Sequence, residues 1–330
     1  MVGGRVKGAK ARNAEAAGER KIRAARLSVL SNGLLVVLKL VVGFVTGSVG
    51  VLSEAVHSGI DLLAALIAAF AVRRASHPPD PDHPFGHGKF ENISGALEAL
   101  LIFAAAAYIV VEALEKLLEG GELAHLETGL VVMALSAAVN IAVSRNLFRV
   151  ARETDSIAIE ADAWHLRTDV YTSVGVFLAL TAICLSDLLV TDPDANMRFH
   201  ALDPLVALGV AAMICRAAVD LTRRSVGGLL DRPLPEEEDG VIREILQRHN
   251  TGFVEFHELR HRKAGSERHI DLHLVVARDT TVGEVHTLCD RIEEEIQEKL
   301  PQANVLIHAE PCADACPTCK VKDACKLPPP

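Results

Sequence analysis

Six apolar segments, each close to the length of the hydrocarbon core of a bilayer, run through the chain up to residue 222. A helix needs about 20 consecutive, mostly apolar residues to cross a membrane. The candidate segments are 27–47, 50–73, 93–115, 127–148, 163–190 and 202–222. Charged residues interrupt the start of the fifth segment, but residues 170–190 are apolar enough to retain it. The chain is therefore expected to be an α-helical membrane protein with six transmembrane helices.

The distribution of Lys and Arg predicts how these helices are oriented, because cytoplasmic loops carry an excess of both residues. Basic side chains are concentrated in the first 26 residues, around the second-to-third and fourth-to-fifth connections, and just after the sixth segment. The remaining connections hold few, and residues 46–50 hold none. We therefore expect an integral protein of the bacterial inner membrane with both termini in the cytoplasm. The formal net charge of −9 argues against a nucleic-acid partner.

The sequence becomes polar near Asp231, and its pattern changes to that of a small α+β domain. We predict a helix at about 235–249, strands at 253–262 and 268–277, a second helix at 281–300 and a third strand at 303–310. Thr281 and Glu284 have the spacing of a capping box at the start of the second helix. The expected domains are a basic cytoplasmic tail (1–26), a transmembrane domain (27–226), a cytoplasmic αββαβ domain (227–311) and a Cys-rich tail (312–330).

Two of the predicted transmembrane helices each carry one His and one Asp four residues apart. Residues with this spacing lie on one face of a helix, so each pair points in one direction. If the two helices face each other, four side chains converge: His57, Asp61, His165 and Asp169. Two imidazoles and two carboxylates match the number and kind of ligands in a tetrahedral Zn²⁺ site. Ionisable groups inside a membrane are usually functional, so the pattern predicts a path for a divalent metal ion.

Such a site has a formal charge of about −2, which either a divalent metal ion or protons can neutralise. A site exposed alternately to each side would bind metal where protons are scarce and release it where they are abundant. Inward movement of protons would then drive metal out of the cytoplasm. Two other classes of protein stay open, an intramembrane metalloenzyme and a metal sensor that does not transport. The sequence has no HExxH motif, which argues against an enzyme.

The order of these features resembles the cation diffusion facilitator family of divalent metal/proton antiporters. The similarity covers residues 27–311 and includes Thr-Gly-Ser-Val at 46–49, His-Pro-Phe-Gly-His-Gly-Lys at 83–89 and Leu-Asp-Arg-Pro-Leu-Pro at 230–235. It implies a homodimer that exports Zn²⁺ in exchange for protons and has a ferredoxin-like (metallochaperone-like) cytoplasmic domain. The two His–Asp pairs match the family's transport site. A His at position 57 resembles the zinc-selective branch, whereas Fe²⁺, Co²⁺, Mn²⁺ and Ni²⁺ stay open as alternative substrates.

The resemblance also implies two accessory metal sites and one charge pair. Asp80, His83 and His87 match a site in the loop between the second and third helices, although a solvated turn would carry the same residues. Five positions match a regulatory two-metal site in the cytoplasmic domain: His257, His273, His286, His308 and Glu310. No single face of one copy gathers all five in the predicted elements, so we expect two copies to share the ions. Lys89 and Asp231 match a charge pair that ties the two domains together at the dimer interface.

The Cys-rich tail lies beyond this resemblance. Its four thiols are close in sequence and suit a Zn²⁺ or iron–sulfur centre: Cys312, Cys316, Cys319 and Cys325. A disordered tail in a reducing compartment, with incidental cysteines, is the alternative interpretation.

Overall fold

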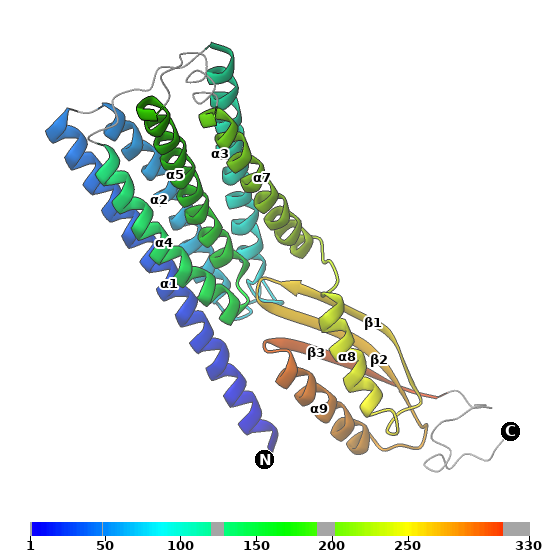
Figure 1. Cartoon of the computed structure of the whole chain (residues 1–330). Coiled ribbons are helices and arrows are strands. Elements are labelled where there is room, and N and C mark those ends of the chain that lie inside the picture. Colours follow the sequence, from blue (N-terminus) through cyan, green and yellow to red (C-terminus); the bar gives the residue numbers. More distant parts are fainter. Residues whose placement is uncertain (1, 48, 120–128, 190–201, 313–330) are drawn as a thin grey trace. The chain divides into compact units, whose positions relative to one another are not determined.

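The computed structural model describes residues 2–47, 49–119, 129–189 and 202–312 (Figure 1). The chain divides into two compact units. One, the helical unit, holds Ala11–Gly227, and the other, the C-terminal domain, contains the chain from Gly228 onward.

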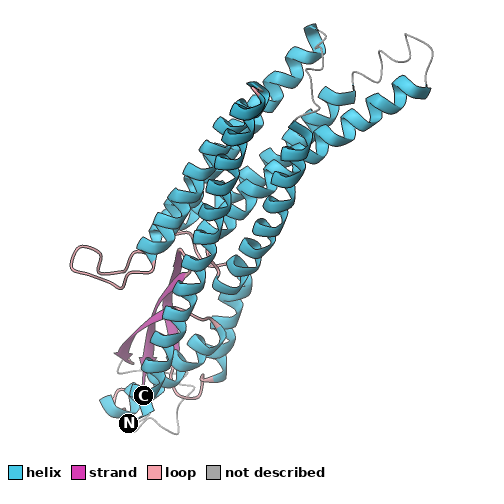
Figure 2. Ribbon diagram, turned by 90° about the vertical axis from the view of Figure 1, so that its left-hand side faces the viewer, coloured by secondary structure: helices cyan, strands magenta, loops and turns pink. Residues whose placement is uncertain are grey.

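Long helices run alongside one another in the helical unit (Figure 2). Each predicted apolar segment corresponds to one of them, within two residues where the segment reaches past a helix end: α1 (Val2–Thr46), α2 (Val49–Ala75), α3 (Lys89–Glu119), α4 (Gly129–Thr154), α5 (Ile157–Leu189) and α7 (Leu202–Leu229). Most of these helices extend beyond the apolar segments by one or more turns. The extension arises because residues such as Lys21 and Glu91 continue the helices with polar sequence.

Four helices are long and apolar enough to cross a membrane, over Glu15–Thr46, Glu54–Ala75, Lys89–Glu115 and Pro204–Leu229. Within the described residues, α4 and α5 do not meet that criterion. Residues 157–175 of α5 carry the ionisable residues Glu160, Asp162, His165, Arg167 and Asp169, which lower the mean hydropathy of that part of the helix. The count of six spans therefore stays a prediction.

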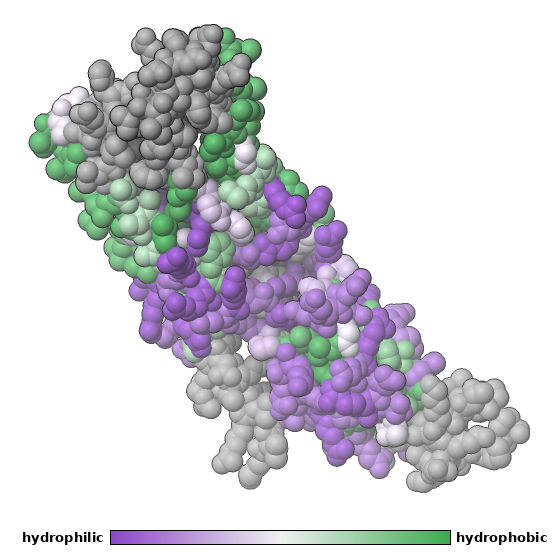
Figure 3. Space-filling view, viewed as in Figure 1, coloured by the Kyte–Doolittle hydropathy of each residue, from purple (hydrophilic) through white to green (hydrophobic). Residues whose placement is uncertain are grey.

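The helical unit exposes many apolar side chains and buries several polar ones. On α1, Leu30, Leu34 and Val37 are exposed, whereas Asn32 and Lys39 are buried. Apolar residues accordingly cover much of the visible surface of the helical unit, and hydrophilic residues cover most of that of the C-terminal domain (Figure 3). An apolar exterior is stable only in contact with lipid or another apolar surface. The pattern therefore fits a helix bundle embedded in a membrane.

Helix α5 is central in this bundle, because it packs against α2, α3 and α4. Small residues permit the close approach of neighbouring helices, and α2 presents fully buried Ala64, Ala65 and Ala68. An apolar cluster packs α1, α2, α4 and α5 together around Leu147, Ile159 and Leu166. This packing holds the face of α5 that carries the second His–Asp pair against its neighbours.

The C-terminal domain has the predicted αββαβ order: α8 (Glu236–Arg248), β1 (Glu255–Ala264), β2 (Glu267–Val276), α9 (Val282–Lys299) and β3 (Ala303–Pro311). The three-stranded sheet has the order β1-β2-β3, with β1 antiparallel and β3 parallel to β2. Thr281 and Glu284 form the predicted capping box at the start of α9. The period of two along β2 buries Ile270, Leu272 and Leu274 in one core with α8 and α9. The alternate residues of β2 therefore lie on the opposite, polar face.

Candidate metal sites

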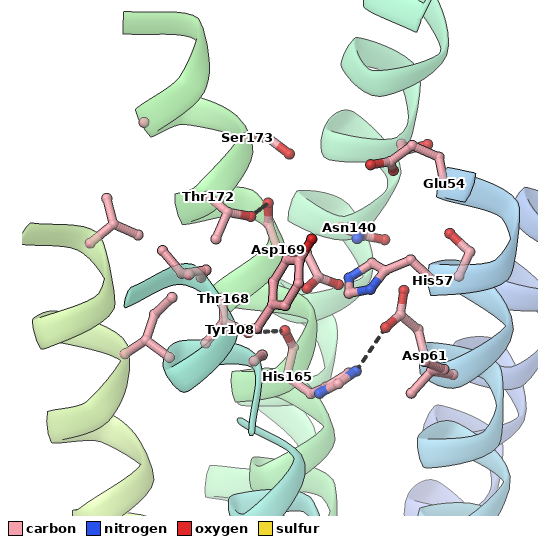
Figure 4. Close-up of a pocket in the computed structure, with 18 of the residues that line it drawn as sticks. Glu54, His57, Asp61, Tyr108, Asn140, His165, Thr168, Asp169, Thr172 and Ser173 are labelled. Carbon is pink, nitrogen blue, oxygen red and sulfur yellow. Dashed lines mark hydrogen bonds and ion pairs between the residues drawn. The ribbon is translucent and has the colours of Figure 1, made fainter. Parts of the chain in front are cut away.

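A cavity of about 660 Å³ lies within the helical unit, and its lining comes from α1, α2, α3, α4, α5 and α7 (Figure 4). The lining residues of α1, α2, α4 and α7 lie in the halves of these helices nearer the α1–α2 turn, whereas those of α3 and α5 lie around the middle of each helix. Toward the other end, the apolar cluster around Leu147 and Ile159 packs α1, α2, α4 and α5 together. The cavity therefore approaches the centre of the bundle from one end.

Both His–Asp pairs face this cavity. Ligand atoms of His57, Asp61 and Asp169 lie within 4.8 Å of one another. His165 Nε2 lies 3.1 Å from Asp61 Oδ1, which joins the α5 pair to the α2 pair (Figure 4). The i, i+4 spacing places each pair on one helix face, and the packing of α5 against α2 brings the faces together. The structure thus gathers the four predicted side chains; that they bind metal stays a prediction.

The polar atoms in this cluster are only partly satisfied within the protein. Asp61 and His165 are each 6% exposed. His165 Nδ1 and Asp169 Oδ2 are buried and have no hydrogen-bond partner among the described residues. Leaving buried polar atoms unpaired is costly. A divalent cation would neutralise the carboxylates and supply the missing partner to Asp169, which is the chemistry of an N₂O₂ ligand set.

The loop between α2 and α3 brings together Asp80, His83 and His87, whose ligand atoms also lie within 4.8 Å of one another. Asp80 Oδ1 accepts from the His83 backbone N–H at 2.7 Å, and Asp80 Oδ2 lies 3.2 Å from His87 Nε2. Desolvation raises the pKa of Asp80, but the hydrogen bonds from His83 outweigh it and hold the pKa below its usual value. An ionised carboxylate beside two imidazoles can hold a metal ion, and metal binding here stays a prediction.

The polar face of the C-terminal sheet carries a row of histidines. His257 pairs with His273 across β1 and β2, and His273 pairs with His308 across β2 and β3. The group His257, His273 and Glu310 has ligand atoms within 4.8 Å of one another, and His308 Nε2 lies 3.6 Å from Glu310. A hydrogen bond with His273, 2.8 Å long, holds the pKa of Glu310 below its usual value. One copy of the domain therefore offers an ionised carboxylate beside three imidazoles.

This row holds four of the five positions expected from the sequence. Strand register aligns three histidines, and Glu310 lies beside them, whereas the fifth position lies elsewhere, as the expectation that no single face gathers all five implies. His286 is the exception: it lies on α9, where its Nε2 is 3.7 Å from Asp290 Oδ2. Only a second copy, or a change of structure, can add His286 to a shared site.

Two further predictions, the charge pair and the metal site of the Cys-rich tail, involve residues that belong to different units or lie partly outside the described residues. Lys89 and Asp231 belong to different units, and within the C-terminal domain Asp231 accepts a 2.9 Å hydrogen bond from Arg262. Cys312 is buried, and its backbone N–H donates to Val276. Cys316, Cys319 and Cys325 lie outside the described residues. The charge pair and the tail metal site stay predictions.

Sequence reasoning missed Lys39 as a residue of the cavity. Its ammonium group donates to Ser58 and Glu54, and all three residues line the same space as the His–Asp pairs. The available signal was a lone Lys within the apolar run of the first segment. Hydropathy alone does not tell whether such a Lys points inward or extends to the lipid headgroups.

Comparison with known proteins places both units in one family. The family model described as the cation efflux transmembrane domain matches residues 25–230, and that of the cation efflux protein cytoplasmic domain matches residues 234–312. An uncharacterized transporter of Synechocystis, sll1263, is 37% identical over 277 residues, covering 84% of this chain and 86% of the relative. The cation-efflux pump FieF of Yersinia enterocolitica is 32% identical over 296 residues, covering 89% and 94%.

A solved structure of CzrB, described there as a candidate zinc transporter, is 41% identical. It covers 24% of this chain and 99% of the solved one, with a TM-score of 0.23. The two family matches together span nearly all of the chain from residue 25 to residue 312. This chain is therefore a member of the cation diffusion facilitator family, the cation efflux transporters.

Proposed function

We propose that this protein exports divalent metal ions, with Zn²⁺ as the preferred substrate, from the cytoplasm in exchange for protons. The observation that carries the proposal is the convergence of His57, Asp61, His165 and Asp169 on one cavity in a helix bundle with an apolar exterior. Two neutral nitrogens and two carboxylate oxygens suit Zn²⁺ in number and kind. Membership of a cation efflux family supports transport over catalysis or sensing alone.

Exchange for protons follows from the charge of this ligand set. Two carboxylates near the centre of a membrane are costly unless a cation neutralises them. Metal and protons compete for the same lone pairs, so each favours release of the other. A carrier that exposes the site to one side at a time then couples outward metal movement to inward proton movement.

We further propose that six helices cross the membrane with both termini in the cytoplasm. The positive-inside distribution of Lys and Arg supports this orientation. In that orientation the cavity extends away from the cytoplasm, because its lining residues from α1, α2, α4 and α7 lie in the halves of these helices nearer the α1–α2 turn. The apolar cluster around Leu147 and Ile159 would close the cytoplasmic side, as expected of an outward-facing state.

The accessory sites fit a regulatory role in the proposed transporter. The row of His257, His273 and His308 with Glu310 is exposed on a sheet face, where it can respond to cytoplasmic Zn²⁺. The match to the family's cytoplasmic domain supports a homodimer in which two such faces approach each other. The loop site at Asp80 and His87 is a second candidate for Zn²⁺ outside the bundle.

The test is metal flux into proteoliposomes that contain the purified full-length chain and a metal-sensitive dye. Wild-type protein should transport Zn²⁺ faster than Fe²⁺, Co²⁺, Mn²⁺ or Ni²⁺, and a pH gradient should accelerate it. Asp61→Asn and Asp169→Asn should each lower flux at least a hundredfold, because each replaces a charged carboxylate ligand with a neutral amide that binds a divalent ion much more weakly. Asp220→Asn is the matched control, since Asp220 is an exposed carboxylate of α7 paired with Arg224. Flux by either site variant at the control rate would refute the assigned site.

A further inference from the structure

The cavity of the proposed transport site contains a buried ammonium group. Lys39 is 5% exposed, and its Nζ donates to Ser58 Oγ at 2.8 Å and to Glu54 Oε2 at 3.1 Å. Among the described residues that line the cavity, Lys39 is the only Lys or Arg. The proposed metal pathway therefore includes a fixed positive charge.

The direction of this side chain is set by α1. Asn32, Leu35 and Lys39 follow one another at helical spacing and are all buried, whereas Leu34 and Val41 on the outer face are exposed. A Lys near a membrane surface ordinarily extends its ammonium group toward the lipid headgroups. Here the group points into the bundle instead. Its desolvation is offset by a carboxylate and a hydroxyl, both from α2.

Lys39 affects the charge that a metal ion meets in the cavity. Four carboxylates line it, those of Glu54, Asp61, Glu112 and Asp169. Lys39 interacts electrostatically with Asp169, although its hydrogen bonds go to Glu54 and Ser58. A unit positive charge in the cavity repels a divalent cation at its ligands. Affinity for metal is thus lower than the four carboxylates alone would give.

We propose that Lys39 promotes release of the metal ion from the transport site into the outward cavity. This inference rests on the proposed function and adds a residue that sets the rate of release. Rapid transport requires that binding be strong enough to load the site but weak enough to unload it. Lys39 weakens metal binding by its charge, without being a metal ligand itself.

Glu54 fixes the position of the Lys39 ammonium group in the cavity. It precedes His57 by three residues on α2, so the two side chains share a helix face. Its carboxylate is 45% exposed and anchors the ammonium group at the cavity wall. The ion pair between Glu54 and Lys39 holds the ammonium group away from the proposed metal ligands. It also keeps the carboxylate of Glu54 bound to Lys39. Removing either member should therefore shift metal affinity, and the two shifts should have opposite signs.

The experiment measures the Zn²⁺ affinity of the full-length protein in detergent. Binding that persists in Asp169→Asn is subtracted, so that only binding at the transport site is counted. Lys39→Met should bind Zn²⁺ about tenfold more tightly, the order expected when one unit charge several ångströms away is removed. In proteoliposomes the same variant should show a lower KM and a lower maximal rate. Lys39→Arg should retain wild-type affinity because it retains the charge. Glu54→Gln should bind Zn²⁺ more weakly, because it leaves the positive charge of Lys39 uncompensated.

A double-variant comparison separates this role from general damage to the fold. Glu54→Gln should have a much smaller effect in the Lys39→Met background than in the wild type. Glu112→Gln, which removes another carboxylate of the same cavity, should have the same effect in both backgrounds. If Lys39→Met weakens binding or leaves it unchanged, the inference is wrong. If Lys39→Met does not fold, Glu54→Gln tests the inference by itself: unchanged or tighter Zn²⁺ binding by Glu54→Gln would show that the inference is wrong. If Asp169→Asn removes no binding, the proposed transport site itself fails.

Discussion

At the scale of single residues, position 57 decides the character of the proposed ligand set. His57 faces the cavity one helical turn from Asp61, and its ring lies beside Asp169 (Figure 4). An imidazole at this position gives the cluster two nitrogens and two carboxylates, a borderline-soft set that suits Zn²⁺. A carboxylate in its place would add a charge and make the set harder. Selectivity is therefore expected to respond to this one side chain.

We predict that His57→Asp shifts transport toward harder or larger ions, raising the rate for Cd²⁺ or Mn²⁺ relative to Zn²⁺ several-fold. The measurement is flux of each ion into proteoliposomes at equal free concentration. His77→Asp, in the exposed connection after α2, is the control for an added carboxylate outside the cavity. An unchanged ratio of rates in His57→Asp would show that this residue does not set selectivity.

The sequence predicts the His–Asp pairs well because their geometry is local. A spacing of four residues fixes a shared helix face before any tertiary structure is known. Lys39 shows the limit of that reasoning. Whether its ammonium group turns inward depends on Ser58 and Glu54 from a neighbouring helix, and no periodicity in the sequence encodes that contact.

At the scale of elements, the same contrast appears in the C-terminal sheet. The alternation along β2 predicts which residues face the core, since strand period is local. The row formed by His257, His273 and His308 depends instead on the register of three strands. The register shifts between His257 and Arg260, where Glu258 has a φ of 50°. A bulge of this kind changes which residues lie opposite each other, so the row could not be predicted from the sequence.

Three elements of the helical unit meet at a buried ion pair. Lys21 of α1 donates to Glu91 of α3 at 2.7 Å, and Ser156, just before α5, donates to the same carboxylate at 2.6 Å. Lys21 is 5% exposed and Glu91 is fully buried. A buried charge that loses its partner is costly, whereas exposed pairs contribute little. This cluster should therefore stabilise the junction of the three elements.

We predict that Glu91→Ala destabilises the protein by about 3 to 5 kcal/mol, because it leaves Lys21 buried without its carboxylate. Glu153→Ala breaks a more exposed pair, with Arg20 at 3.6 Å, and should cost less than about 1 kcal/mol. Thermal unfolding of both variants in detergent gives the comparison. Equal melting temperatures for the two variants would contradict the role assigned to the buried pair.

At the scale of the whole molecule, the C-terminal domain gathers only part of its proposed metal site in one copy. His257, His273, His308 and Glu310 share one face of the sheet, whereas His286 is highly exposed on α9 beside Asp290. A homodimer would let two copies share ions, and Zn²⁺ would offset repulsion between carboxylates at the interface. If Zn²⁺ binds only to the pair of associated domains, its binding also stabilises that pair. Cytoplasmic metal would then draw the two domains together.

We predict that Zn²⁺ shortens the distance between the paired C-terminal domains and raises the melting temperature of the full-length protein. Labels on a bio-orthogonal amino acid at Val282, an exposed position in the first turn of α9, report the distance by fluorescence transfer. The double variant His273→Ala with His308→Ala should lose both effects, since it removes two of the three imidazoles in the row. His249→Ala is the control, because His249 contacts Glu295 away from that row. If the double variant retains the distance change and the stabilisation, the regulatory site lies elsewhere in the chain.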